Sequence, residues 1–146
     1  MKPNILFLLV DSLRQDKCYG KNKTSITPNL DFIINQGTFF SQTISPSSIT
    51  IPSLSSIFSG LYSYECTTLD HELFNMDPRI HTFIDDLNNS GYSTGAIIPE
   101  SINHTNLIQS FSNVELFDSF GTLYDGVGEQ IISKINNFKN LPWFLY

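Results

Sequence analysis

Two residues of this chain have the type and the setting to do chemistry, Thr50 and Asp11. Thr50 lies in residues 48–53, Ser-Ile-Thr-Ile-Pro-Ser, just ahead of an expected short helix. Asp11 follows the apolar run of residues 5–10, which is typical of a buried parallel strand. A hydroxyl nucleophile at a helix N-terminus and a carboxylate at a strand end are half of a metal-assisted group-transfer site. No second cluster of metal ligands is evident after Thr50.

Both residues also have a plain structural interpretation. Asp11 would cap the segment 12–14, and the spacing alone leaves capping and metal binding about equally open. Thr50 would be an N-terminal cap, which is the commoner role for a threonine at such a position. The chemical interpretation of Thr50 gains weight because a helix N-terminus stabilises the anionic group under attack in phosphoryl and sulfuryl transfer.

The elements that would position these residues alternate between apolar strands and amphipathic helices. This alternation predicts an α/β fold with a mainly parallel central sheet flanked by helices. The expected strands cover residues 4–10, 38–44, 92–98, 114–117 and 143–146. The expected helices cover residues 28–36, 53–58, 78–90 and 123–138. The unbroken apolar run in the first strand predicts a central position with burial on both faces. Because ligands of such sheets bind outside the carboxyl ends of the strands, Asp11 is placed at the expected binding edge.

Length and composition favour one folded domain over residues 1–146. The chain is 40% hydrophobic and 13% aromatic, enough to bury a core, and its 15% of charged residues is too few for a disordered segment. The net charge of -6 argues against a nucleic-acid partner, whose phosphates require a basic face. The basic residues among the first 23 positions are interpreted as solvated surface, with attraction of an anionic substrate as the alternative.

Cysteine use and hydropathy indicate the compartment. Cys18 and Cys66 form neither a CxxC pair nor a disulfide framework, which favours a reducing environment. The run of residues 5–10 is short and has no signal-peptide cleavage site, and no run approaches the ~20 apolar residues of a membrane span. We therefore expect a soluble, cytoplasmic protein. The last residues, 143–146, belong to an apolar strand without a cap or polar tail, so we expect the natural protein to continue.

Several short motifs, in their order and spacing, resemble the N-terminal part of a sulfatase, within the alkaline-phosphatase-like superfamily. As a set they are specific to that branch, although no single one is, and the resemblance covers essentially the whole chain. The motifs are Lys2 to Arg14, Cys18-Tyr19-Gly20, Thr27 to Asp31, Thr50-Ile51-Pro52-Ser53, Ser59 to Tyr62, Phe83 to Leu87, Ser90 to Thr94 and Leu141 to Tyr146.

The resemblance implies hydrolysis or transfer of sulfate or phosphate esters at one or two divalent metal ions, either calcium, magnesium, manganese or zinc. Asp11 matches the family's first metal-binding aspartate, and Thr50 matches the nucleophile, which also contacts the metal. The family's later metal ligands lie beyond this chain. The resemblance thus implies an alkaline-phosphatase-like sandwich that is incomplete at its C-terminus.

Three residues depart from the family pattern. In sulfatases the nucleophile is a Cys or Ser that is converted to formylglycine, an aldehyde that Thr50 cannot form. Leu54 stands where the motif has arginine, and Ser12 replaces the second aspartate of an acidic pair. A direct threonine nucleophile resembles the phosphatase, phosphodiesterase and phospho-transferase branches of the superfamily. The alternative is an inactive remnant or a binding module that has kept the sheet.

Other polar residues are weaker candidates. His71, between Asp70 and Glu72, is expected in a solvated loop rather than in a metal site. His81 and His104 are expected to be structural or exposed, and the pair Asp85-Asp86 is expected on the solvated face of its helix.

Overall fold

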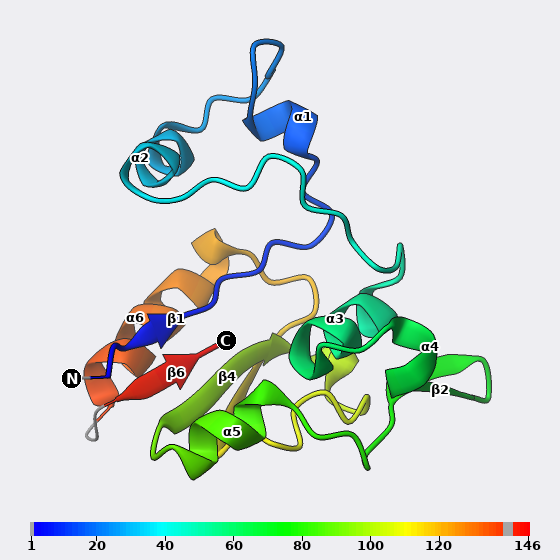
Figure 1. The fold of residues 1–146 in the computed structure, drawn as a ribbon. Coiled ribbons are helices and arrows are strands. Elements are labelled where there is room, and N and C mark those ends of the chain that lie inside the picture. Colours follow the sequence, from blue (N-terminus) through cyan, green and yellow to red (C-terminus); the bar gives the residue numbers. More distant parts are fainter. Residues whose placement is uncertain (1, 139–141) are drawn as a thin grey trace. The chain divides into compact units, whose positions relative to one another are not determined.

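The chain forms two compact units in the computed structural model, which describes residues 2–138 and 142–146 (Figure 1). The first unit combines Met1–Leu8 with Pro46–Tyr146, and the second is Leu9–Ser45. A single catalytic domain over residues 1–146 stays a prediction. Leu141, the first residue of the last family-like motif, lies outside the described residues.

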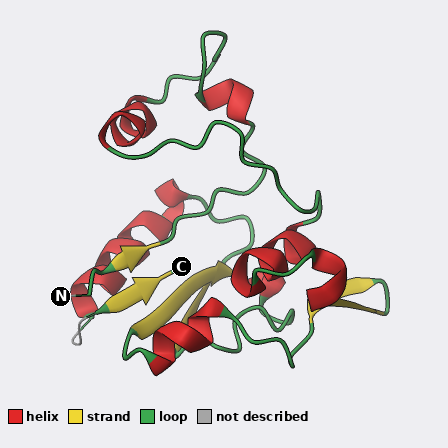
Figure 2. Cartoon of the chain, viewed as in Figure 1, coloured by secondary structure: helices red, strands yellow, loops and turns green. Residues whose placement is uncertain are grey.

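The first unit is built on a parallel sheet of four strands (Figure 2). All three pairings are parallel, with Gly95 opposite Asn113 on one side and Leu145 on the other. This confirms the predicted α/β class with a parallel sheet flanked by helices. In spatial order the strands are β1 (Ile5–Leu6), β6 (Trp143–Leu145), β4 (Ser93–Pro99) and β5 (Asn113–Phe117).

Strand β4 is covered by helices on both faces. Its residues Thr94 to Ile98 are all buried, which confirms the strand expected over residues 92–98. Ala96 and Ile98 belong to the core that also includes residues of α3 (Thr50–Ser59) and α5 (Phe83–Asn89). Gly95 faces the opposite side, towards α6 (Val127–Asn137). The sheet thus holds helices on its two faces, as Figure 1 shows.

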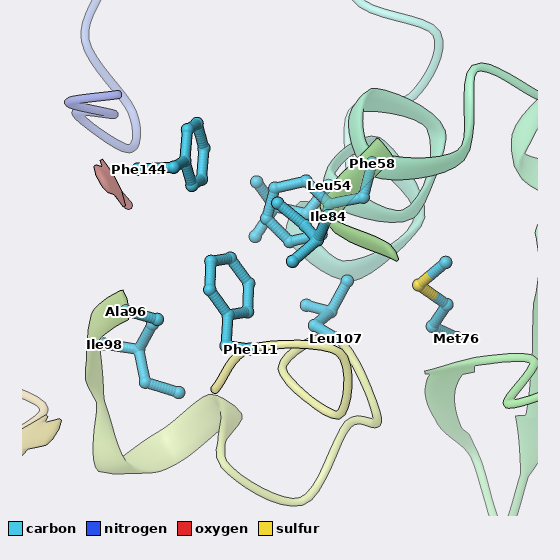
Figure 3. Packing of buried hydrophobic residues seen from close by; sticks show 9 residues of the cluster. All are labelled: Leu54, Phe58, Met76, Ile84, Ala96, Ile98, Leu107, Phe111 and Phe144. Atoms are coloured by element: carbon cyan, nitrogen blue, oxygen red, sulfur yellow. The ribbon is translucent and has the colours of Figure 1, made fainter. Parts of the chain in front are cut away.

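Phe58 is the centre of the hydrophobic core, and it is 1% exposed. Its ring packs edge to face against Phe83, Phe111 and Tyr146, with centroid distances of 5.9, 6.0 and 5.1 Å. Figure 3 shows Phe58 with Leu54 and the other buried side chains between the helices and the sheet. These contacts fix helix α3 on the sheet.

The prediction for the first strand is wrong in extent and position. Only Ile5 and Leu6 form β1, and among the described residues β1 pairs with β6 alone, at one end of the sheet. Phe7 extends the pairing by one hydrogen bond, from its N–H to the Leu145 carbonyl at 2.8 Å. Leu6 is 46% exposed and Leu8 is 60% exposed. Burial on both faces is not reached, because no other described strand lies beside β1.

The helix expected to start near Asp77 begins six residues later, at Phe83. Thr82 and Asp85 form a capping box: the Thr82 N–H donates to Asp85 Oδ2 at 2.8 Å, and the Asp85 N–H donates to Thr82 Oγ1 at 3.4 Å. Asp77 instead binds Arg79, with Arg79 Nη2 2.6 Å from Asp77 Oδ2. Ile80 therefore lies before the helix, and its apolar side chain packs against the core without being part of a helical face.

Helix α4 (Ser63–Cys66) and the hairpin of β2 (Thr67–Asp70) and β3 (Leu73–Met76) were not predicted. His71 and Glu72 form the two-residue turn, and both have positive φ angles, of 45° and 66°. Turns of this kind usually contain Asn or Gly, so the pair His-Glu does not predict a hairpin. His71 is exposed, as expected for a solvated loop.

Two further short elements are 3-10 helices, η1 (Glu100–Ile102) and η2 (Leu123–Asp125). The expected helix over residues 123–138 is divided by Gly126, whose φ angle of 99° interrupts it between η2 and α6.

The second unit contains α1 (Gln15–Cys18) and α2 (Pro28–Gln36), and the expected strand 38–44 is absent there. Thr27 and Gly37 bound α2 as predicted. Lys23 Nζ lies 2.5 Å from Asp31 Oδ2 and ties the preceding loop to this helix. The segment 38–44 forms a turn and loop because no described strand pairs with it.

The core is tested by replacing Phe58 with alanine. The cavity left by this ring should lower the free energy of unfolding by about 3–5 kcal/mol. Ile57→Ala is the matched control, because the neighbouring side chain is 37% exposed and its loss should cost about 1 kcal/mol. Urea unfolding followed by circular dichroism measures both. Equal losses for the two variants would show that Phe58 is not the centre of the core.

The Asp77–Arg79 pair predicts a pH dependence of stability. Hydrogen bonds from the Arg79 guanidinium lower the pKa of Asp77 from 3.8 to about 2. The stabilisation from Asp77 is therefore present above its unfolded pKa of 3.8 and is lost as the pH falls towards 2. The difference in unfolding free energy between wild type and Asp77→Asn should shrink over this interval. A difference that stays constant would contradict the assignment.

Candidate functional site

Thr50 is the first residue of helix α3. The N-cap is Ile49, which has extended backbone angles and makes no side-chain capping bond. The interpretation of Thr50 as the cap residue is therefore wrong by one position, because the helix begins at Thr50 itself. Its side chain is partly exposed, on a helix that is fixed by the buried residues of its second and third turns.

The first backbone N–H groups of α3 precede the hydrogen-bonding pattern of the helix. The Ser53 N–H donates to the Ile49 carbonyl at 3.0 Å, which is the first bond of the helical pattern. Thr50 and Ile51 carry the amides that precede this bond, and Pro52 has none to lose. Pro52 is therefore accommodated at the third helical position, and the helix begins three residues before the expected start at Ser53. The backbone at Thr50 has the polarity that favours an anion.

Leu54 lies one helical turn after Thr50, on the same side of α3. It is 3% exposed and packs in the core with Phe58 and Ile84. The position at which the family motif has arginine is thus filled by an apolar side chain that the core holds. No cation is supplied from this position.

Asp11 belongs to the second unit and lies in a turn. The Ser12 N–H donates to Asp11 Oδ1 at 2.9 Å, and Ser12 has a φ angle of 58°. Asp11 does not cap the next helix, because the N-cap of α1 is Arg14. Its carboxylate and the Thr50 hydroxyl are oxygen donors, which suit hard divalent cations such as calcium and magnesium. Among residues 2–138 and 142–146, no three His, Cys, Asp or Glu side chains gather into a group that could hold a metal ion.

The other polar candidates have structural roles or lie at the surface. His81 Nε2 is 2.8 Å from Asp86 Oδ1, and this contact raises the pKa of the imidazole. Asp85 serves the capping box of α5. Cys18 and Cys66 are buried free thiols.

One polar cluster, between α6 and β5, was not predicted from the sequence. Lys134 of α6 reaches Glu115 of β5, with Nζ 2.6 Å from Oε1, and also contacts the Asn113 side chain. This contact lowers the pKa of Glu115. The two charged residues are nineteen positions apart. The only signal in the sequence was a polar residue inside an expected strand, Glu115, which had no assigned partner.

No helix in the described part of the chain is long and apolar enough to cross a membrane.

Comparison with known proteins identifies relatives across this chain. The sulfatase family profile matches residues 3–140. An N-acetylglucosamine-6-O-sulfatase of Bacteroides thetaiotaomicron is 34% identical over 99 residues, which cover 66% of this chain and 17% of that protein. An N-acetylgalactosamine-6-O-sulfatase of the same organism is 33% identical over 103 residues, 66% of this chain and 20% of that protein. An arylsulfatase of Clostridium perfringens is 27% identical over 149 aligned positions, 99% of this chain and 30% of that protein.

The chain therefore spans between 17% and 30% of the length of these relatives. Its four-stranded parallel sheet flanked by helices is consistent with part of an alkaline-phosphatase-like fold. Because the family profile covers nearly all of the sequence, the chain belongs to the sulfatase family, and it corresponds to the N-terminal part of its members.

Proposed function

We propose that this chain contributes the nucleophile and one metal ligand of an enzyme that cleaves or transfers sulfate or phosphate esters. The observation that carries the proposal is the position of Thr50 as the first residue of α3, in a chain of the sulfatase family. Because the relatives are several times longer than the aligned part, we propose that this chain acts as part of a longer protein.

Thr50 Oγ1 attacks the sulfur or phosphorus atom of the ester. A bond forms from Oγ1 to that atom while the bond to the ester oxygen breaks, and the proton lost from Oγ1 leaves with the alcohol. The oxygen of water, or of a second alcohol in a transferase, then bonds to the same atom, the bond to Oγ1 breaks, and Oγ1 takes up the proton that this oxygen loses. The N-terminus of α3 supports this step because its amide dipoles stabilise negative charge on the oxygens of the transferred group.

Asp11 and Thr50 are proposed to hold a divalent cation, calcium, magnesium, manganese or zinc. A bound cation supplies Lewis acidity and lowers the pKa of a coordinated hydroxyl. The donor set fits in kind, because both residues offer oxygen atoms, but two donors are fewer than the six or more that calcium takes. We propose that the remaining ligands come from sequence outside this chain.

The substrate is proposed to be an anionic sulfate or phosphate ester. Membership of the sulfatase family supports the sulfate ester, and two relatives are named for sugar 6-O-sulfates. The unmodified threonine supports the phosphate ester, because it cannot form the aldehyde that the family resemblance implies for sulfate cleavage. Both esters therefore belong in the assay.

A second candidate function is a catalytically inactive relative or a binding module. It is favoured by Leu54, which is buried in the core at the position where the family motif has a cation. The two functions differ in turnover, so the tests of Thr50 and Asp11 separate them.

The nucleophile is tested in the protein expressed from its full reading frame. With para-nitrophenyl sulfate, para-nitrophenyl phosphate and N-acetylglucosamine 6-sulfate as substrates, Thr50→Ala should lower kcat by about a thousandfold or more, because no other atom replaces Oγ1. Thr68→Ala is the control, since Thr68 lies exposed in the β2–β3 hairpin. Wild-type rates in Thr50→Ala would refute the assignment, and absence of turnover in wild type would favour the second candidate.

The metal ligand is tested by metal content as well as by rate. Chelation with EDTA should abolish turnover of the same esters, and Asp11→Asn should lower the amount of divalent metal that co-purifies, because a charged oxygen ligand is lost. Asp16→Asn is the matched control. Asp16 lies five residues after Asp11, is exposed and pairs with Arg14. Plasma mass spectrometry measures the metal. Equal metal content in wild type and Asp11→Asn would contradict the role of Asp11.

A further inference from the structure

A pocket of about 500 Å³ lies between helix α6 and the amino-terminal ends of strands β4 and β5. Its wall includes Tyr92, Ser93, Asn113, Lys134 and Phe138. Thr50 is not among the residues that line it. All of its residues belong to the first unit. The volume is in the range of small-molecule sites.

Gly95 allows two side chains of the pocket wall, Phe138 and Lys134, to lie close to strand β4. A Cβ atom at this position would lie 3.3 Å from Phe138 Cζ and 3.4 Å from Lys134 Cε. The aliphatic part of Lys134 therefore packs against the β4 backbone, and Lys134 lines the pocket. Phe138 is held in place by Trp143, with ring centroids 5.2 Å apart and planes inclined by 8°.

Lys134 is the strongest polar feature of this pocket, with a side chain that is 12% exposed. Its ammonium group has three N–H donors. Glu115 and Asn113 accept two of them, and no third acceptor is found among the described residues. A nearly buried donor without a protein acceptor is costly unless water or a ligand accepts from it.

Among the described residues that line the pocket, the charges of the side chains sum to zero. Only Lys134 and Glu115 carry a charge there, and they are paired with each other. Gln130 donates to the second Glu115 oxygen at 3.3 Å, which holds the carboxylate in place. A free anion would meet this carboxylate beside the ammonium, and a free cation would meet the ammonium. An uncharged ligand is not opposed by either group.

The remaining wall is rich in hydroxyl and amide groups next to an aromatic ring. Ser93, Ser112, Ser133 and Asn137 line the pocket together with the ring of Phe138. Such a wall can donate to and accept from hydroxyl groups, while the ring packs against an apolar C–H face.

We propose that this pocket binds a neutral, hydroxyl-rich ring of the size of one pyranose sugar. One sugar hydroxyl accepts from the third N–H of Lys134, another donates to Glu115, and the C–H face of the ring lies on Phe138. This site goes beyond the proposed ester chemistry, since it needs neither Thr50 nor turnover.

The test is an amide chemical-shift titration of the protein expressed from its full reading frame with methyl glucopyranoside and methyl galactopyranoside, with inorganic sulfate as a separate probe. At least one sugar should give saturable shifts at Ser93, Asn113 and Ser133, with a Kd of about 1–10 mM. Ser133→Trp fills the pocket mouth and should weaken binding about tenfold or more. Asn136→Trp, on the same helix but not lining the pocket, should leave the Kd within about twofold.

Three results would overturn the proposal: no saturation by either sugar at about 100 mM, equal affinity in wild type and Ser133→Trp, or tighter binding of sulfate than of the sugars. If Ser133→Trp loses the dispersed spectrum of a folded chain, Asn137→Trp fills the same pocket one turn later and decides the question. Thr50→Ala should bind the sugars as wild type does, so failure of the ester chemistry and failure of this site are distinguishable.

Discussion

The packing of helix α3 on the parallel sheet through Phe58 is the interaction on which the rest of the first unit depends. Phe58 joins α3 to α5 through Phe83 and to the end of β6 through Tyr146. Leu54 adds a second buried contact one turn earlier. With these two side chains fixed, the first turn of the helix has a defined direction, and Thr50 is presented at its N-terminus. The candidate nucleophile is thus positioned by apolar packing rather than by polar contacts.

The same packing limits what the helix can contribute to chemistry. Thr50 and Leu54 lie on one side of α3, one helical turn apart. Leu54, which is next to the candidate nucleophile, is buried in the core. Charge compensation for an anionic group has to come from the helix dipole and from a cation, not from a side chain at position 54. Asp11 is the carboxylate proposed to hold that cation, and it belongs to the other unit, in the turn formed with Ser12.

Where local pattern and burial agreed, the elements could be predicted from the sequence. Strand β4 contains the apolar residues Ala96, Ile97 and Ile98 and is buried on both faces, and α2 has Thr27 before it and Gly37 after it. Where two signals competed, the prediction failed. Asp77-Pro78 has the form of a helix start, but the capping box of Thr82 and Asp85 is stronger. The turn residues His71 and Glu72 adopt positive φ angles, which cannot be predicted from these two residue types.

For the candidate site, the sequence predicted that Thr50 lies at the start of a helix and that Asp11 follows an apolar run. It did not predict which residue caps the helix or that Leu54 is buried in the core. Those depend on which helix face meets the core, as does the pairing of Lys134 with Glu115 from separate elements. The apolar run of residues 5–10 predicted a central strand, yet its neighbour in the described sheet is β6 alone. Position within a sheet depends on partners, which a local pattern does not contain.

The central claim is that Thr50 becomes covalently attached to the group it transfers. The most direct measurement is mass spectrometry of peptides from the full-length protein, quenched in acid during turnover of a sulfate or phosphate ester. The account predicts an added mass of one sulfuryl or phosphoryl group on the peptide that contains Thr50, and no such mass in Thr50→Ala. Turnover with the group on another residue, or with no adduct under conditions that trap a comparable intermediate, would contradict it.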